Sequence, residues 1–207
     1  MRKQTLFITS IVLLAIILYS FKTPLIDGAN KNLNTNLDEK IERKVDSVLA
    51  LMRLNEKIGQ LVQYSGKWNA TGPSASNADK HKLNKLKNGE VGSMLNITSV
   101  ASIRETQKMV MDHSRLKIPL IFGYDVIHGY KTIFPIPLGE SASWDLEIIK
   151  KTAAIAAKET AASGIQWTFA PMIDISRDAR WGRVMEGAGE DVYLNAVIGV
   201  ARVQGFQ

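Results

Sequence analysis

Two hydrophobic patterns alternate along residues 37–207. Apolar residues three and four apart predict helices at residues 37–50, 55–63, 99–115, 143–163 and 190–207. Between them, short apolar runs bounded by turn residues predict strands at 91–96, 118–124 and 165–171. In the longest of these helices, Ser143 is the expected N-cap and Gly164 the expected end. The second half of the chain therefore alternates strand, helix, strand, helix, strand, helix.

This alternation predicts an α/β fold. Repeated strand–helix units form a parallel sheet whose faces are covered by the helices that connect the strands. The composition agrees, because 45% of the 207 residues are hydrophobic and 22% are charged, which is typical of a globular domain.

The first 36 residues follow a different pattern. The chain starts with the basic sequence MRK, followed by an almost wholly apolar run from Leu6 to Tyr19. Such a start predicts a signal peptide over residues 1–20, because the apolar run is shorter than the roughly 20 residues of a spanning helix. An uncleaved N-terminal anchor is the alternative. In either case we expect the remaining chain to be exported, to the periplasm or the extracellular space. Residues 21–36 are polar and turn-rich, and are predicted to be a linker.

Charge and cysteine content exclude several function classes. The formal net charge is +6, but residues 91–207 carry equal numbers of acidic and basic side chains, so the excess lies elsewhere. The lysine cluster from Lys80 to Lys87 has the spacing of the solvated face of a short helix, and we expect no nucleic-acid partner. Cysteine is absent, which excludes disulfides and thiolate zinc sites. The sequence contains neither the HExxH zinc motif nor the GxSxG nucleophile motif.

Polar residues gather where two predicted strands end. Asp125 directly follows the strand at 118–124. The segment after the strand at 165–171 carries a cluster of charged residues: Asp174, Arg177, Asp178, Arg180, Arg183, Glu186, Glu190 and Asp191. In parallel α/β folds the reactive groups lie at the carboxyl ends of the strands, so these two segments are expected to face one rim.

Some of these residues have a structural explanation. Asp178 and Arg180 are expected to take part in salt bridges of the loop, whereas Glu190 and Asp191 place negative charge at the start of a helix. Asp125 has no such explanation, and needs a donor such as a nearby arginine or a pair of sugar hydroxyls. For His128 we expect a neutral ring bonded to a neighbouring loop rather than a general base.

Three stretches of the sequence together resemble glycoside hydrolase family 3, close to its β-glucosidase branch. They are GYDVIHGYKTIFPIPLGESASWD, FAPMIDISRDARWGRVMEGAGEDVYL and LNEKIGQLVQ, and they occur in the order found in that family. The resemblance implies a TIM-like (β/α)8 barrel that removes terminal non-reducing β-D-glucosyl or related residues from oligosaccharides or glucosides. It also implies retention of configuration through a covalent intermediate, with no metal and no organic cofactor.

The resemblance also implies roles for three residues in substrate binding. Asp125 matches the aspartate that holds hydroxyls of the non-reducing-end sugar, and Arg183 matches the arginine of the WGR motif at the same subsite. Lys131 stands where many relatives have arginine, and an ammonium cannot replace a planar two-pronged donor. Glu140 stands where many relatives carry an apolar residue, and Arg53 where a helix-capping threonine is usual.

We assign no catalytic residue. In the family, the nucleophilic aspartate lies on a later barrel strand, and the acid/base usually comes from beyond the barrel. Only three strands are predicted here, whereas a full barrel has eight. We therefore expect residues 37–207 to be the N-terminal part of an incomplete barrel that is inactive by itself. A catalytically inactive sugar-binding barrel and a membrane-anchored interaction protein remain as alternatives, and glucosidase, xylosidase and N-acetylglucosaminidase activities are not separated.

Overall fold

The computed structural model describes residues 31–66 and 77–207, which form parts of two compact units. The first unit ends at Leu51 and contains helix α2 (Lys31–Leu51). This helix begins before the predicted start at residue 37, so the end of the predicted linker is helical. The predicted signal segment, residues 1–20, lies outside the described residues. No helix in the described part of the chain is long and apolar enough to cross a membrane.

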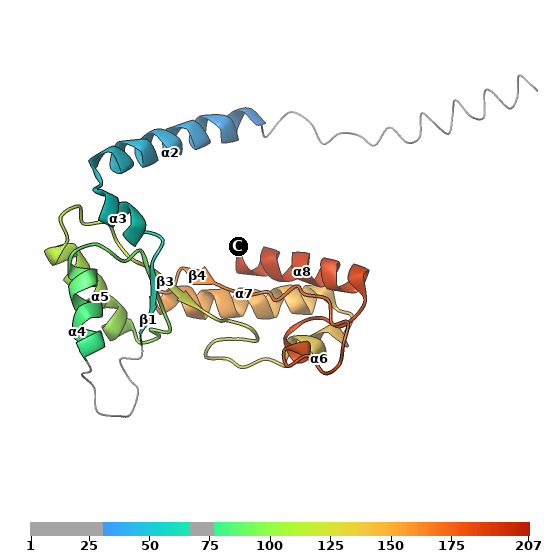
Figure 1. Cartoon of the computed structure of the whole chain (residues 1–207). Coiled ribbons are helices and arrows are strands. Elements are labelled where there is room, and N and C mark those ends of the chain that lie inside the picture. The colour runs from blue at the N-terminus through green and yellow to red at the C-terminus, as the bar shows by residue number, and fades with distance from the viewer. Residues whose placement is uncertain (1–30, 67–76) are drawn as a thin grey trace, which may run out of the picture. The chain divides into compact units, whose positions relative to one another are not determined.

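The second unit, Met52–Gln207, is built on a parallel sheet. Its strands are β1 (Gln63–Ser65), β2 (Ser93–Leu95), β3 (Ile121–Tyr124) and β4 (Trp167–Thr168), paired in that order and all parallel. The predicted parallel sheet is confirmed (Figure 1). The count of three strands is wrong, because no strand was predicted at β1, whose first residue was included in the predicted helix at 55–63. A three-residue strand is too short to show its own periodicity.

Helices connect and cover these strands. They are α3 (Leu54–Gly59), α4 (Asn77–Lys87), α5 (Val100–His113), α6 (Pro137–Ser141), α7 (Leu146–Ala162), the 3₁₀ turn η1 (Val184–Glu186) and α8 (Val192–Phe206). The predicted cap of α7 is wrong. Because the short helix α6 precedes it, α7 begins only after Asp145, whose carboxylate accepts from the Glu147 and Ile148 amides at 3.1 and 3.0 Å. The Ser143 hydroxyl instead donates to the Glu140 carbonyl at the end of α6.

The main core lies between the central strands and helices α4 and α5. Met94 and Phe122 are directly opposite each other in β2 and β3, and both are buried. Leu86 of α4 and Val110 of α5 belong to the same buried cluster. The packing of these side chains holds β3 in place, and it therefore also sets the position of Asp125, which directly follows the strand.

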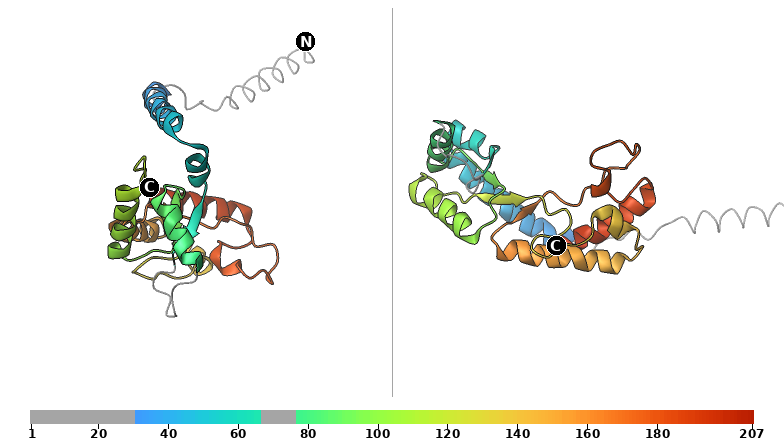
Figure 2. Two further views of the ribbon diagram at one scale, coloured as in Figure 1. Left: turned by 60° about the vertical axis from the view of Figure 1, so that its left-hand side comes forward. Right: turned by 90° about the horizontal axis from the view of Figure 1, so that it is seen from below.

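A second apolar cluster joins α7 to α8, which lie side by side in each view of Figures 1 and 2. Ile149 from α7 packs there with Ile198 and Ala201 from α8. The two helices are in close contact at Gly205, where a Cβ atom would overlap the Lys150 carbonyl oxygen. A side chain at this position would push the helices apart, so Gly205 permits α8 to pack closely against α7.

Candidate functional site

Asp125 leaves the sheet at the carboxyl end of β3. The next residue, Val126, is 0% exposed, whereas Asp125 itself is exposed. No residue in the described ranges donates a hydrogen bond to the Asp125 carboxylate. A buried apolar neighbour thus anchors the main chain while leaving the carboxylate available to a ligand.

The loop after Asp125 is closed by hydrogen bonds to itself. The Phe134 amide donates to the His128 carbonyl at 2.9 Å, and the His128 Nδ1 lies 3.0 Å from the Phe134 carbonyl. Because a carbonyl oxygen only accepts, Nδ1 carries the hydrogen in this contact. His128 is hydrogen-bonded as predicted, but its partner lies within its own loop rather than in a neighbouring loop. The turn depends on Gly129, whose φ is +111° and whose Cβ would overlap the Thr132 carbonyl.

Glu159 in α7 holds the far end of this loop. Its carboxylate accepts from the Lys131 and Thr132 amides, both at 2.8 Å, and from the Thr132 hydroxyl at 2.6 Å. The Thr132 hydroxyl bond is the main cause that lowers the pKa of Glu159. The main chain at Lys131 therefore faces α7.

The segment after β4 supplies the second group of charged residues. Arg183 donates from Nε and Nη2 to both carboxylate oxygens of Glu186, at 3.0, 3.1 and 2.6 Å. This hydrogen bonding is the largest cause that raises the pKa of Arg183, and the negative charges of Asp174 and Asp125 raise it further. Asp125 therefore lies within electrostatic reach of Arg183, although the two residues come from different loops.

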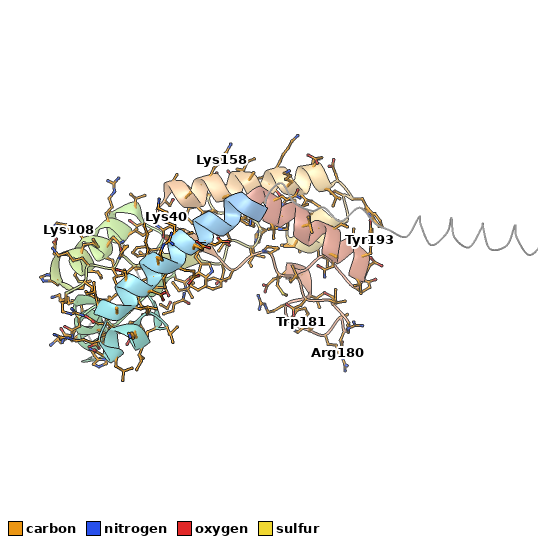
Figure 3. The ribbon with its side chains drawn as sticks, turned by 90° about the horizontal axis from the view of Figure 1, so that it is seen from above. Lys40, Lys108, Lys158, Arg180, Trp181 and Tyr193 are labelled. Carbon is orange, nitrogen blue, oxygen red and sulfur yellow. The ribbon has the colours of Figure 1, made fainter. Side chains whose placement is uncertain are left out.

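Three other charged residues of this segment have the structural roles expected of them. Arg180 forms a salt bridge with Asp178 at 2.5 Å, and Figure 3 shows Arg180 and Trp181 at the outer edge of the loop. Asp191 caps α8, because its carboxylate accepts from the Leu194 amide at 2.6 Å. The predictions of a loop salt bridge and of a helix cap are confirmed.

The two groups of residues meet at a cavity of about 550 Å³. Its lining combines a carboxylate pair, a guanidinium and an imidazole with apolar side chains: Asp125, Ile127, His128, Ile136, Pro137, Arg183, Met185 and Glu186. The volume lies within the range of small-molecule sites. Hydrogen-bond acceptors and donors beside apolar walls are suited to a ligand that offers both hydroxyl groups and C–H surface.

The structure brings together two of the three residues that the sequence singled out for binding. Asp125 and Arg183 both line the cavity, whereas Lys131 is not among its lining residues. The apolar walls formed by Ile136 and Met185 were missed, because nothing in their spacing distinguishes them from core residues. Glu186 could have been recognised from its position three residues after Arg183, at the other end of a short helical turn.

The described residues show no metal centre. No group of three or more histidine, aspartate or glutamate side chains in the described ranges is arranged to hold a metal ion.

Comparison with known proteins shows which family this chain is similar to. Residues 53–207 match the sequence model of the glycosyl hydrolase family 3 N-terminal domain. A periplasmic β-glucosidase of Salmonella typhimurium is 43% identical over 163 residues, which cover 79% of this chain and 20% of that protein. A β-xylosidase of Formosa agariphila is 29% identical over 196 residues, covering 94% of this chain and 22% of the relative.

A solved structure has the same fold over most of the chain. The crystal structure of a β-glucosidase from Listeria innocua in complex with glucose superimposes with a TM-score of 0.70 at 40% identity, covering 80% of this chain and 24% of that one. The chain thus spans only about a fifth to a quarter of the length of the relatives it matches.

Proposed function

The chain belongs to glycosyl hydrolase family 3, and we propose on this basis that the whole protein removes terminal non-reducing β-D-glucosyl residues from β-linked oligosaccharides or glucosides. The family membership rests on a match over residues 53–207 and on the 43% identity with the Salmonella β-glucosidase. In this proposal the present chain supplies part of the sugar-binding wall of a TIM-like barrel.

One observation carries the proposal: Asp125 and Arg183, from the ends of different strands, line the same cavity. A carboxylate can accept hydrogen bonds from two neighbouring sugar hydroxyls, and charged acceptors make the stronger bonds. Arg183 uses Nε and Nη2 on Glu186, so its Nη1 group can donate to a sugar oxygen. Glu186 fixes the plane of the guanidinium and thereby its direction into the cavity.

The chemical step is proposed to use carboxylates from outside residues 31–207. Retaining hydrolysis needs two carboxyl groups about 5–5.5 Å apart, one as nucleophile and one as acid/base. In this proposal the exposed carboxylate of Asp125 binds hydroxyls, and that of Glu186 is already engaged by Arg183. Their proposed contribution is to hold the sugar ring so that its anomeric carbon faces the nucleophile.

A second candidate function is β-xylosidase activity, which the 29% identity with the Formosa enzyme favours. Glucose and xylose differ by the hydroxymethyl group, so aryl glycosides of the two sugars separate the candidates. We expect the whole protein to give the higher kcat/KM with 4-nitrophenyl β-D-glucoside. We also expect the first product seen by proton NMR to have the β configuration.

Each other outcome has a definite meaning. Faster cleavage of the xyloside would replace the first candidate by the second. A first product with the α configuration would contradict the retaining mechanism, and no cleavage of either glycoside would contradict the proposed function as a whole. The N-acetylglucosaminide belongs in the same series, because it tests the third sugar left open by the sequence.

Two further roles belong to the proposal. The protein is proposed to be exported to the periplasm, which the likeness to a periplasmic relative supports. Lys131 is proposed to contact substrate only through its long side chain, since its amide bonds to Glu159 and it is not a cavity-lining residue. Lys131→Met should therefore reduce kcat/KM less than Asp125→Ala does.

A further inference from the structure

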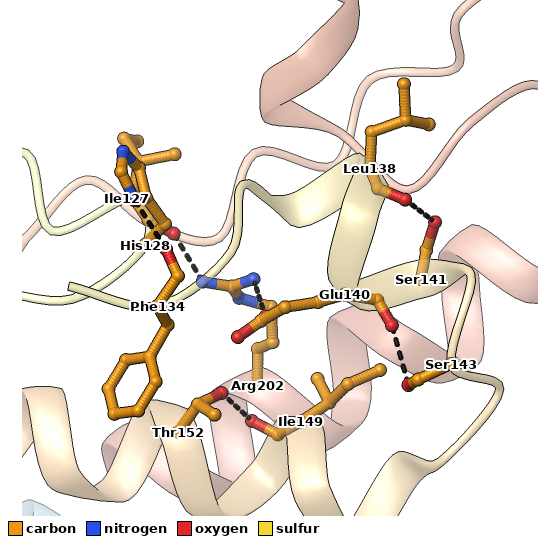
Figure 4. Close-up of polar contacts among 10 residues, drawn as sticks. All are labelled: Ile127, His128, Phe134, Leu138, Glu140, Ser141, Ser143, Ile149, Thr152 and Arg202. Carbon is orange, nitrogen blue, oxygen red and sulfur yellow. Dashed lines mark hydrogen bonds and ion pairs between the residues drawn. The ribbon is translucent and has the colours of Figure 1, made fainter.

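A buried ion pair lies beneath the cavity. Glu140 of α6 and Arg202 of α8 are only 6% and 4% exposed, and Nη1 of Arg202 lies 2.8 Å from a carboxylate oxygen of Glu140. Figure 4 shows the guanidinium between the Glu140 carboxylate on one side and the main chain of the loop after β3 on the other. The pair joins two helices that are far apart in the sequence.

The same guanidinium has a second partner, the loop that carries the candidate site. Nη2 of Arg202 donates a hydrogen bond to the carbonyl oxygen of Ile127. Ile127 lies between Asp125 and His128, and all three residues line the cavity. Arg202 therefore fixes the main chain at the centre of the segment from which the sugar-binding carboxylate projects.

A contribution to stability alone does not explain the ion pair between Glu140 and Arg202. Oε1 of Glu140 and Nε of Arg202 are buried, and neither has a hydrogen-bond partner among the described residues. Burial lowers the pKa of Arg202, and the charge of Glu140 only opposes that effect. Replacing such a pair by apolar residues of similar volume is often neutral or stabilising, because the cost of desolvating two charges disappears.

An apolar pair could fill the same space but could not donate to Ile127. Since the carbonyl of Ile127 would then lose its donor, the main chain there would be free to shift. The far end of the loop would still be held by Glu159, through the Lys131 and Thr132 amides. The expected change is therefore a local displacement next to Asp125 rather than unfolding of the loop.

We propose that Glu140 and Arg202 are a positioning pair: Glu140 orients the guanidinium, and Arg202 fixes Ile127 so that Asp125 and His128 point into the cavity. The kinetic part of this inference rests on the proposed function. Its structural part, the anchoring of the Ile127 main chain, does not depend on which reaction the whole protein catalyses.

The test compares Glu140→Leu, Arg202→Met and the double variant in the whole protein. Each single variant should melt at a lower temperature than the wild type, because one charge stays buried without its partner. The double variant should regain the melting temperature, since both charges are gone. Its kcat/KM for the aryl glycoside should nevertheless stay about 10- to 100-fold below that of the wild type, with kcat reduced, because the sugar-binding carboxylate is displaced.

Two comparisons make the kinetic result specific. The double variant Lys108→Met/Asp112→Leu removes an exposed ion pair of α5, at 2.5 Å, and should leave kcat/KM unchanged. Arg202→Lys keeps a positive charge beside Glu140, but its single ammonium group replaces the two guanidinium nitrogens that donate to Glu140 and Ile127. It should therefore keep a melting temperature near that of the wild type, while its kcat falls toward that of the double variant.

A second measurement does not need activity. Amide hydrogen exchange should become faster in the peptide covering residues 124–130 of the Glu140→Leu/Arg202→Met protein, while exchange in α5 stays as in the wild type. A double variant with wild-type melting, kcat/KM and exchange would overturn the proposal. A double variant as unstable as the single variants would assign the pair to stability and would also overturn it. If the wild-type protein cleaves no glycoside, the proposed function fails, and the exchange result alone decides this inference.

Discussion

Replacing Asp125 by alanine should abolish useful turnover while the fold survives. No described residue donates a hydrogen bond to the Asp125 carboxylate, so the substitution breaks no bond within the described part of the protein. Asp125 is exposed, and substitutions at such positions usually change stability by no more than about 0.5 kcal/mol. The melting temperature of the variant should therefore stay close to that of the wild type.

The loss of activity follows from the bonds that the carboxylate makes to substrate. A hydrogen bond to a charged group contributes about 1.5–3 kcal/mol, which corresponds to a factor of roughly 10–160 in kcat/KM. If both oxygens of Asp125 accept from sugar hydroxyls, the loss reaches about 10²–10⁴-fold. Because such bonds tighten in the transition state, kcat should fall as well as kcat/KM.

The assay is hydrolysis of 4-nitrophenyl β-D-glucoside by the whole protein, alongside a thermal melt. Asp178→Ala is the matched control: it removes an exposed aspartate from the segment after β4 and loses the salt bridge to Arg180. It should retain near wild-type kcat/KM. A similar kcat/KM for Asp125→Ala and the wild type would refute the assignment of Asp125, and equal losses in the two variants would show that the effect is not specific to the cavity.

Further predictions concern other parts of the chain. Arg183→Lys should lower kcat/KM by about tenfold or more and Arg180→Lys should not, because only Arg183 lines the cavity and a lysine cannot hold two partners at once; equal kinetics would refute this choice of arginine. The pKa of Glu56 lies below its ordinary value of 4.5, chiefly because Arg115 hydrogen-bonds to its carboxylate. The stability that this contact gives the fold is therefore fully present above pH 4.5 and is lost as the pH falls through the lowered pKa. Glu56→Gln should make the melting temperature less sensitive to acid, and unchanged sensitivity would contradict that account. N-terminal sequencing of the exported protein should begin near Phe21, whereas an intact Met1 in the membrane fraction would favour the anchor.

Much of the fold follows from local patterns that the sequence displays directly. Helix α5 and strand β3 were predicted because a helical stripe or an apolar run of sufficient length carries its own signal. Strand β1 has three residues and helix α6 has five, so neither is long enough for a period to become visible. Missing α6 also displaced the predicted cap of α7 from Asp145 to Ser143, because the chain turns between the two helices.

The residues of the candidate site could likewise be predicted only in part from the sequence. Asp125 and Arg183 could be predicted, because each follows a strand and stands in a recognisable motif. The pairing of Arg183 with Glu186 becomes visible only in the structure, although the two residues stand three apart in the sequence. Lys131 was singled out by its place in the motif, but sequence position does not reveal that its amide bonds to α7.

Arg202 could not have been found from the sequence as part of the site. It lies in an apolar helix at a spacing that indicates only helical structure, and its partner Glu140 belongs to a helix that was itself missed. A contact between residues this far apart depends on how α6 and α8 pack, which no local pattern contains. The two residues were recognisable only as charges in apolar surroundings.

The central claim, that Asp125 and Arg183 hold the terminal sugar, is tested most directly by a crystal structure of the whole protein with bound glucose. The account predicts glucose in the cavity that these two residues line, with a carboxylate oxygen of Asp125 and a guanidinium nitrogen of Arg183 within about 2.5–3.2 Å of sugar oxygens. Glucose bound elsewhere, or bound in this cavity without contact to either residue, would contradict it.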